Sequence, residues 1–280
     1  PLSSFDSMAW STLPKPQILS PEISSVDALL MLTITTSGRR KPAAMNIILL
    51  RESDWTDEHS VRLNDYRAQH VINVIQPALG QSLRVGLING HKGIGTVTAI
   101  DSAIVQLDVA LTESPPTRHP TRLVLALPRP KMLRRILRTV AEFGVDELHL
   151  IHSYRVEKSF WQSPLLKKGK VESALIQGLE RAGDTILPVV TEHRRFKPFI
   201  EDSLSSIAAE RDLVIAHPGG EYRLQTEDEK QRCLLVGPEG GFIDYEIELA
   251  RSLGATVAHL GNRIMSVDTA VCAVLARDLY

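Results

Sequence analysis

The chain has few cysteines, no long apolar run and almost no net charge, and each lack excludes a class of protein. Its two cysteines, Cys233 and Cys272, form no Cys-x-x-Cys pair, which argues against a structural zinc site and favours a reducing compartment. No apolar run approaches the roughly 20 residues that a membrane-spanning helix needs. The formal net charge is -1, so any binding of nucleic acid would depend on a local basic surface. We therefore expect a globular protein without a metal or a membrane partner.

Residues 1–44 are rich in Ser, Thr and Pro and show no sustained hydrophobic period. No basic segment precedes the short apolar piece ALLMLTI, which argues against a secretory signal. We expect a disordered leader or an over-extended gene start, with the folded protein beginning at Met45 and the apolar run NIILL. A cytoplasmic location follows from this interpretation. An organelle transit peptide is the alternative, because the segment has few acidic residues.

The rest of the chain is predicted to form two domains. Residues 45–115 are rich in Val and Ile and are broken by turn residues such as Asn89-Gly90, which is typical of a small β-barrel module. Three prolines in SPPTRHP (Ser114–Pro120) mark a linker. From residue 120 to residue 280, strand-like and helix-like segments alternate. Such alternation predicts an α/β domain with a mostly parallel sheet covered by helices.

The boundaries of these segments are set by their apolar patterns and by capping residues. Strands are predicted over TRLVLAL, ELHLIH, DLVIAHP, CLLVG and TVAHLG. Helices are predicted over KMLRRILRTVAEFG, KVESALIQGLERAG, DYEIELARSLG and DTAVCAVLARDL. In the third helix, Asp244 is expected at the N-cap and Gly254 beyond the end.

The stretch LLVGPEGGFIDYEI (Leu234–Ile247) places three glycines between a predicted strand and a predicted helix. Glycines allow a sharp turn and a close approach to a flat ligand, and ligands of parallel sheets bind beyond the carboxyl ends of the strands. The loop has neither the Gly-Lys-Ser/Thr of a phosphate-binding loop nor a G-x-G-x-x-G pattern. Because it carries Glu239 and no Lys or Arg, it would repel a polyphosphate. A nucleoside cofactor without phosphates, such as S-adenosylmethionine, fits better, and a tight turn without a ligand is the alternative.

A second loop, LGNRIMSVDTA (Leu260–Ala270), follows the next predicted strand, so both loops could share one pocket at the same edge of the sheet. It carries one cation, Arg263, which is either a surface residue or a ligand of a substrate or phosphate. It also carries Asp268, which could be the N-cap of the last helix.

Together the two loops closely resemble the paired C-terminal motifs of the RsmE-type small-subunit ribosomal RNA uridine N3-methyltransferases of the SPOUT superfamily. The resemblance extends over roughly Met45–Tyr280, although only the loops match specifically. It implies a PUA-like β-barrel RNA-binding domain, then an α/β domain with a deep C-terminal trefoil knot. It further implies a homodimer, S-adenosylmethionine as the cofactor, and methylation of uridine N3 in small-subunit (16S) ribosomal RNA, either free or in the assembled subunit.

The resemblance also implies which residues act. Arg263 is the candidate catalytic residue, because a cation would stabilise the negative charge that develops on the uracil oxygens. The base that removes the N3 proton is not identified; water or a backbone carbonyl is possible. The implied cofactor-binding residues come from both loops and from the HP pair that ends an earlier strand: His217, Gly237, Glu239, Gly240, Gly241, Leu260, Gly261, Ile264 and Met265.

A basic segment, RPKMLRRILR, is the candidate RNA-binding surface. No Asp or Glu occurs between Arg122 and Ala141, and a local excess of cations of this kind suits phosphate binding. Most of the cations stand at i, i+3, i+4 and i+7, which places them on one helical face opposite an apolar stripe. A solvated basic face is the alternative. The cations are Arg129, Lys131, Arg134, Arg135 and Arg138.

The chain departs from the family pattern at three positions. Ser266 stands where the second loop usually has arginine, and Asp268 stands where it has glutamate. Asp184 stands where an earlier helix has arginine, and Arg181 is a candidate to compensate. These changes leave two alternatives open. The chain could be an RNA-binding or ribosome-assembly protein that has lost catalysis, or a knotted methyltransferase that acts on another base or on transfer RNA.

Overall fold

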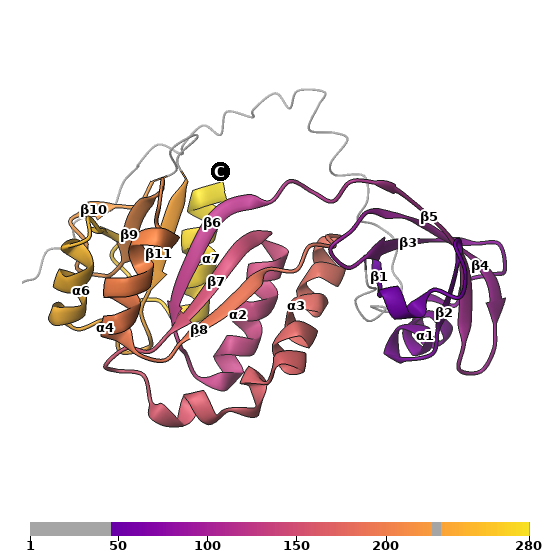
Figure 1. The fold of residues 1–280 in the computed structure, drawn as a ribbon, viewed down its shortest axis with the longest axis horizontal. Coiled ribbons are helices and arrows are strands. Elements are labelled where there is room, and N and C mark those ends of the chain that lie inside the picture. Colours follow the sequence, from indigo (N-terminus) through magenta and orange to yellow (C-terminus); the bar gives the residue numbers. More distant parts are fainter. Residues whose placement is uncertain (1–45, 226–230, 280) are drawn as a thin grey trace, which may run out of the picture. The chain divides into compact units, whose positions relative to one another are not determined.

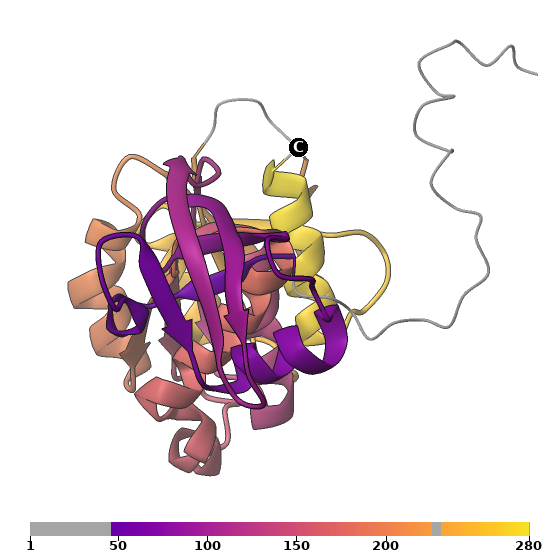
Figure 2. The ribbon, with the colours of Figure 1, turned by 90° about the vertical axis from the view of Figure 1, so that its right-hand side faces the viewer.

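The computed structural model describes residues 46–225 and 231–279, and its chain path is shown in Figures 1 and 2. The expected leader and its alternative as a transit peptide fall on residues 1–44, which lie outside the described residues. Within the described ranges, no helix has both the length and the apolar character needed to span a membrane.

Residues 46–113 form a five-stranded sheet with the strand order β1-β3-β4-β5-β2. The pairing of β1 with β3 is parallel, and all other pairings are antiparallel. A short α1 (Tyr66–His70) continues into the π-helical turn η3 (Val71–Ile75) and covers a separate apolar core. The predicted β-rich character is confirmed for this segment. The strands are β1 (Ile48–Leu50), β2 (Ser60–Leu63), β3 (Ser82–Leu87), β4 (Lys92–Ile100) and β5 (Val105–Glu113).

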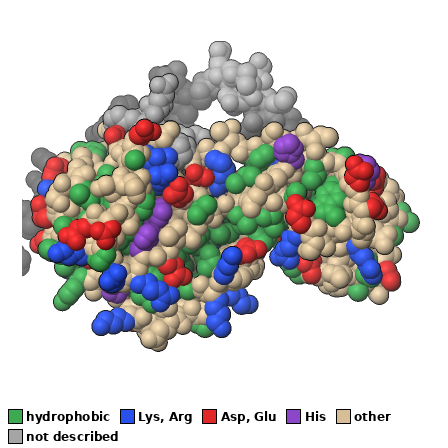
Figure 3. All heavy atoms as spheres, viewed as in Figure 1, with side chains coloured by type: hydrophobic (Ala, Val, Ile, Leu, Met, Phe, Trp, Pro, Cys, Tyr) green, Lys and Arg blue, Asp and Glu red, His purple; other side chains and the backbone are tan. Residues whose placement is uncertain are grey.

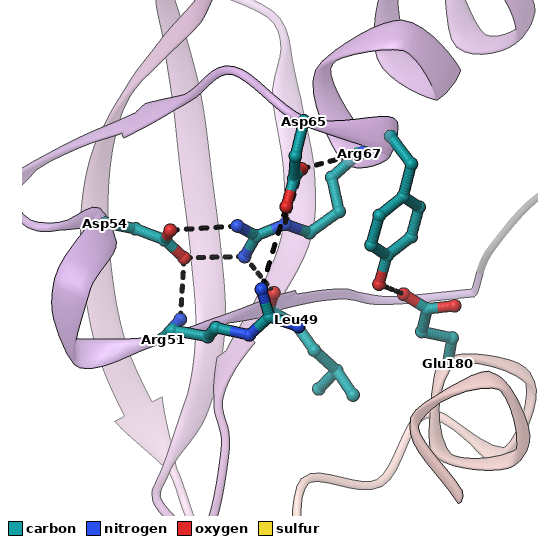
Figure 4. A network of polar contacts seen from close by, with 7 residues as sticks. Leu49, Arg51, Asp54, Asp65, Arg67 and Glu180 are labelled. Carbon is teal, nitrogen blue, oxygen red and sulfur yellow. Dashed lines mark hydrogen bonds and ion pairs between the residues drawn. The ribbon is translucent and has the colours of Figure 1, made fainter. Parts of the chain in front are cut away.

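A buried ion-pair network joins the loops of this sheet to α1 (Figure 4). The Arg67 guanidinium is only 3% exposed, and its Nη1 and Nη2 donate to the Asp54 carboxylate at 2.5 and 2.8 Å. Its Nε donates to Asp65 at 2.9 Å, and Nη1 also donates to the Leu49 carbonyl at 2.6 Å. Burial opposes the charge of Arg67, but the hydrogen bonds to Asp54 and Asp65 outweigh burial and raise its pKa.

Residues 119–259 contribute a seven-stranded sheet in which every pairing is parallel, in the order β10-β12-β9-β11-β6-β7-β8. The central strands are continuous apolar runs, as expected for a sheet covered on both faces. The predicted α/β class with a parallel sheet is confirmed. The strands are β6 (His119–Ala126), β7 (Val145–Ile151), β8 (Val189–His193), β9 (Asp212–Ala216), β10 (Tyr222–Arg223), β11 (Arg232–Val236) and β12 (Thr256–His259).

The helices that cover this sheet agree with the predicted segments, with differences at their ends. α2 packs against both α3 and α7, and a Cβ at Gly178 of α3 would lie 2.4 Å from the Arg138 carbonyl oxygen, so these two backbones approach closely. The prediction of Asp244 as an N-cap was wrong by one position, because Ile243 is the N-cap and Asp244 is the first helical residue. The long helices are α2 (Pro130–Glu142), α3 (Lys168–Ala182), α6 (Asp244–Arg251) and α7 (Val267–Leu279).

Several short helical turns complete the connections, and none of them was predicted from the sequence. Two 3-10 turns lie between β7 and α3, and three short turns precede β9. The sequence signals of such turns are weak, because each is too short to show a hydrophobic period. They are η4 (Lys158–Gln162), η5 (Pro164–Leu166), α4 (Phe196–Pro198), η6 (Phe199–Leu204) and α5 (Ser205–Ile207), and a further turn, η2 (Glu52–Asp54), follows β1.

Replacement of Arg67 by leucine should destabilise the protein by about 3–5 kcal/mol, because it leaves the buried Asp54 carboxylate without its cation. Urea unfolding followed by circular dichroism would measure this change. The matched control is Arg62→Leu, since Arg62 of β2 is exposed and forms no ion pair with another described residue. We expect the control to stay within about 0.5 kcal/mol of the unmodified protein. Equal unfolding midpoints for the two variants would contradict the structural role of the network.

Candidate cofactor and RNA site

Three neighbouring parallel strands end at the same edge of the sheet, and the loops that follow them enclose a cavity of about 170 Å³. The strands are β9, β11 and β12, and their loops begin at His217, Gly237 and Leu260. All of the predicted cofactor-binding residues except Gly240 line this cavity, and so does Arg263. The structure therefore brings together residues that are up to about 50 positions apart in the sequence.

The cavity wall also contains residues that the sequence analysis did not single out. Apolar side chains supply much of it, including Val236, Phe242, Val267 and Ala270. They belong to core-like patterns, so nothing in the sequence distinguishes them from ordinary core residues. A larger cavity of about 450 Å³ lies beside Tyr222 and Thr256. It holds none of the predicted residues.

The first loop depends on its glycines for its tight shape. A Cβ at Gly237 would lie 3.1 Å from the Phe242 backbone nitrogen and 3.2 Å from the Gly241 Cα, so a side chain there would crowd the turn. Gly241 has a φ of +73°, in the left-handed region that favours glycine. Gly240 does not line the cavity; a Cβ there would lie 2.9 Å from Cδ of Arg155.

Carboxylates fasten the first loop to its neighbours. Glu239 Oε1 accepts a hydrogen bond from the Arg129 backbone N–H at 3.1 Å, which ties the loop to the start of α2. Glu246 is 3% exposed, and its two oxygens accept from the backbone N–H groups of Ile243 and Tyr154 at 3.0 and 2.7 Å. The loop after β7 is thereby held against the loop after β11. The sequence offered no signal for this contact, because about 90 residues separate its partners.

His217 forms part of the cavity wall as a neutral hydrogen-bond donor. Burial lowers the pKa of its imidazole, Asp244 opposes that shift, and the nearby Arg155 guanidinium adds to it. Its Nδ1 accepts a hydrogen bond from the Gly219 N–H at 3.1 Å. In the neutral ring the proton is therefore on Nε2, which lies 3.8 Å from the position of a Cβ built on Gly241. His217 can donate to an oxygen in the cavity, but its Nε2 cannot act as a base.

The departures from the family pattern in the second loop are structurally accommodated. Ser266 lines the cavity, and its hydroxyl donates to Asp268 Oδ1 at 2.5 Å. This hydrogen bond is the main cause of the lowered pKa of the Asp268 carboxyl. α7 begins at Val267, so Asp268 lies in its first turn and not at its N-cap. The exposed Arg263 side chain forms no ion pair with any of the described residues, so it remains available to a ligand.

Among the described residues, two of the five basic residues at the start of α2 and along it have side-chain partners, and three do not. Arg135 pairs with Asp268 at 3.5 Å, and Arg138 donates to Gln177 of α3 at 2.6 Å. The exposed side chains of Arg129, Lys131 and Arg134 form no ion pair within the part of the chain that the structure describes. Figure 3 shows Lys and Arg side chains gathered on the lower part of the body that contains the parallel sheet.

Asp184 and Arg181 lie away from the cavity wall. Asp184 is buried and accepts a hydrogen bond from Arg118 Nη1 at 2.8 Å. Its other oxygen accepts from the Thr185 N–H at 2.6 Å, so the carboxylate shapes the turn after α3. Arg181 pairs with Glu142 of α2 at 3.5 Å. Within the described ranges, no group of three or more His, Cys, Asp or Glu residues could hold a metal ion.

The sequence profile of the RNA methyltransferase domain family matches residues 115–277, which is more than half of the chain. The chain belongs to the RNA methyltransferase family. The ribosomal RNA small subunit methyltransferase E of Treponema pallidum is 29% identical over 238 residues, covering 83% of this chain and 90% of that protein. The protein of the same name from Synechocystis is 26% identical and covers 79% of this chain and 73% of its own length.

Two solved structures share the fold. The ribosomal RNA small subunit methyltransferase E of Neisseria gonorrhoeae, bound to S-adenosyl methionine, has a TM-score of 0.65 and is 18% identical, over 83% of this chain and 95% of that chain. A Legionella pneumophila methyltransferase in complex with the same cofactor has a TM-score of 0.64 and is 19% identical, over 84% and 96% of the two chains. These findings confirm the resemblance that the two loops indicated.

The protonation of His217 gives a direct test of the cavity geometry. We expect its imidazole to titrate below the usual histidine range, with the proton of the neutral ring on Nε2. Replacement of Arg155 by glutamine should raise the pKa of His217, because it removes a neighbouring positive charge. Nitrogen-15 NMR titration of the labelled protein measures both quantities. A neutral ring protonated on Nδ1, or an unchanged pKa in the variant, would show that these contacts are wrong.

Proposed function

We propose that the chain transfers the methyl group of S-adenosylmethionine to N3 of a uridine in small-subunit ribosomal RNA. The observation that carries the proposal is the cavity at the carboxyl ends of β9, β11 and β12, which collects both glycine loops and Arg263. The names of the relatives and the cofactor bound to the Neisseria gonorrhoeae protein support the substrate and the cofactor.

The residues of the cavity fit S-adenosylmethionine. Gly241 leaves space that a side chain would fill, and Phe242, Leu260 and Ile264 offer apolar surface to a flat ring. The first loop carries no cation that would select a polyphosphate. When bound, the cofactor supplies an electrophilic methyl group on a sulfonium. The proposed binding set is completed by His217, Glu239, Gly261 and Met265. Gly240 does not line the cavity and would act only by shaping the loop.

The chain's own part in the reaction is to position the uracil and to stabilise its developing charge. The N3–H bond must break as the new N3–carbon bond forms, and negative charge then develops on the uracil oxygens. A cation placed at such an oxygen lowers the activation barrier by roughly 3–4 kcal/mol. Arg263 is the cation of the cavity wall, and the Nε2–H of His217 is a second donor. The N3 proton leaves to water, and the bond between the methyl group and its sulfur would break as the N3–carbon bond forms.

The RNA would extend from this cavity over α2. Arg129 connects the cavity and α2, because its backbone N–H donates a hydrogen bond to Glu239 of the first loop.

We further propose that residues 45–115 form a PUA-like barrel that binds RNA, and that residues 120–280 form the methyltransferase domain with a C-terminal trefoil knot. The family resemblance supports a homodimer and a cytoplasmic location. Arg135 and Arg138 would have to leave their present partners to reach phosphate.

The decisive experiment is a methyl-transfer assay with radiolabelled S-adenosylmethionine. The substrates are free small-subunit RNA and assembled subunits from cells that lack the enzyme, and the label is mapped to its nucleotide. We expect label on N3 of a single uridine. Cofactor binding without transfer to either substrate would favour an RNA-binding or assembly protein without catalysis. Label on another base or on transfer RNA would redirect the proposal to a different substrate.

Replacement of Arg263 by alanine should lower kcat by about 10²–10³-fold, because the developing oxyanion loses its cation. Cofactor affinity, measured by calorimetry, should change little. Arg195→Ala is the matched control, since Arg195 is exposed and does not line the cavity. A kcat for Arg263→Ala close to that of the control would remove Arg263 from the mechanism.

The combined change Lys131→Ala and Arg134→Ala should weaken RNA binding and reduce its dependence on salt. Each lost phosphate contact lowers the slope of log K against log salt by about 0.7–0.9. Filter binding at several salt concentrations measures the slope. Arg251→Ala serves as the control, because Arg251 is paired with Glu221 and lies on α6. An unchanged slope in the double variant would place the RNA elsewhere.

A further inference from the structure

The loop that follows β7 donates two hydrogen bonds, one to α6 and one to the first glycine loop. The Tyr154 backbone N–H donates to the buried Glu246 carboxylate at 2.7 Å. One residue later, Arg155 Nη1 donates to the Gly240 carbonyl oxygen. The aliphatic stem of Arg155 lies so close to Gly240 that a Cβ there would meet Cδ at 2.9 Å. The backbone of this loop is therefore held in place beside the cavity.

The two side chains of this loop are nonetheless exposed. Tyr154 is 78% exposed, and its side chain makes neither a hydrogen bond nor a ring contact with any residue in the described ranges. Arg155 is also exposed, and only one of its five N–H donors is used by Gly240. An aromatic ring on an anchored backbone, with no partner of its own, can receive a flat ligand at a low cost in conformational entropy.

Arg155 is separated from the cavity only by Gly241, which lines the cavity wall. A Cβ built on Gly241 would lie 4.0 Å from Arg155 Nη1 and 3.8 Å from His217 Nε2. Gly241 and His217 both line the cavity, whereas Tyr154 and Arg155 do not. The exposed Arg155 guanidinium thus stands just outside the wall of the cavity, and the exposed Tyr154 ring belongs to the preceding residue of the chain.

We propose that Tyr154 and Arg155 form the subsite for the target nucleotide, with the Tyr154 ring stacked on the extruded base and the Arg155 guanidinium donating to an oxygen of the same nucleotide. The proposal rests on the proposed function and adds the residues that receive the substrate. A base inside a helix must leave the stack before its N3 can react, and an aromatic face compensates for the lost stacking. Uridine stacks weakly, so an added platform matters for it.

The stacking part is tested by Tyr154→Ala beside Tyr154→Phe, with steady-state methyl transfer at varied RNA concentration. We expect the alanine variant to lower kcat/KM for RNA about tenfold and the phenylalanine variant to stay within about twofold, because the ring is retained. Cofactor affinity should be unchanged in both. Tyr222→Ala is the control for loss of an exposed tyrosine away from the cavity. Equal kcat/KM for Tyr154→Ala and the control would overturn the subsite.

The role of Arg155 is tested by Arg155→Ala and Arg155→Lys. A contact with the nucleotide predicts a lower kcat/KM for RNA in the alanine variant, partial rescue by lysine, and unchanged cofactor affinity. A loss of cofactor affinity that accounts for the whole effect would show that Arg155 only supports the glycine loop.

Failure of the proposed function is distinguishable from failure of the subsite. If the proposed function is wrong, the protein without any substitution will methylate no RNA. The subsite would then be tested by equilibrium binding of a fluorescent uridine-containing single strand in the presence of cofactor. Tyr154→Ala should bind this strand about tenfold more weakly than Tyr154→Phe, and equal affinities would overturn the proposal.

Discussion

The parallel pairing of β9 with its two neighbours is the constraint on which the site depends. Ala216, the last residue of β9, pairs with Val236 of β11 on one side and with Ala258 of β12 on the other. Three chain segments therefore leave the sheet at the same height and in the same direction. Their loops must share the same space, and the glycines allow them to do so without filling it. A shift of one register position would separate the first glycine loop from His217.

Charge is distributed around this edge in a consistent way. Two carboxylates near the cavity are used internally, since Glu239 and Glu246 both accept from backbone N–H groups. The cations point outward, with Arg263 at the second loop and Arg155 over the first. Backbone N–H groups thus compensate the charge of these carboxylates. A polyanionic substrate can therefore approach a locally basic surface, although the chain as a whole is nearly neutral.

The sequence was most informative where one segment carries its own signal. The apolar runs of β6 and β11, the amphipathic pattern of α2 and the glycine loops were all predicted, and the loops meet as expected. Edge strands were missed because they are short and half polar: β8 has no buried residue, and β10 has two residues. The partners of Arg135, Arg138 and Asp184 were missed because each depends on a side chain from a distant segment. No period or motif encodes such contacts.

The order of strands across the sheet has a consequence for how the protein acquires its site. β6 pairs with β7, its nearest neighbour in the sequence, but also with β11, more than 100 residues away. The first pairing is local and the second has a high entropic cost of loop closure, so the second forms late. Every wall of the cavity belongs to the segment from Ala216 to Ala270. A nascent chain that has already completed β6, α2 and α3 still has no cavity, and the ability to bind a cofactor arises only after the segment up to Ala270 has been made.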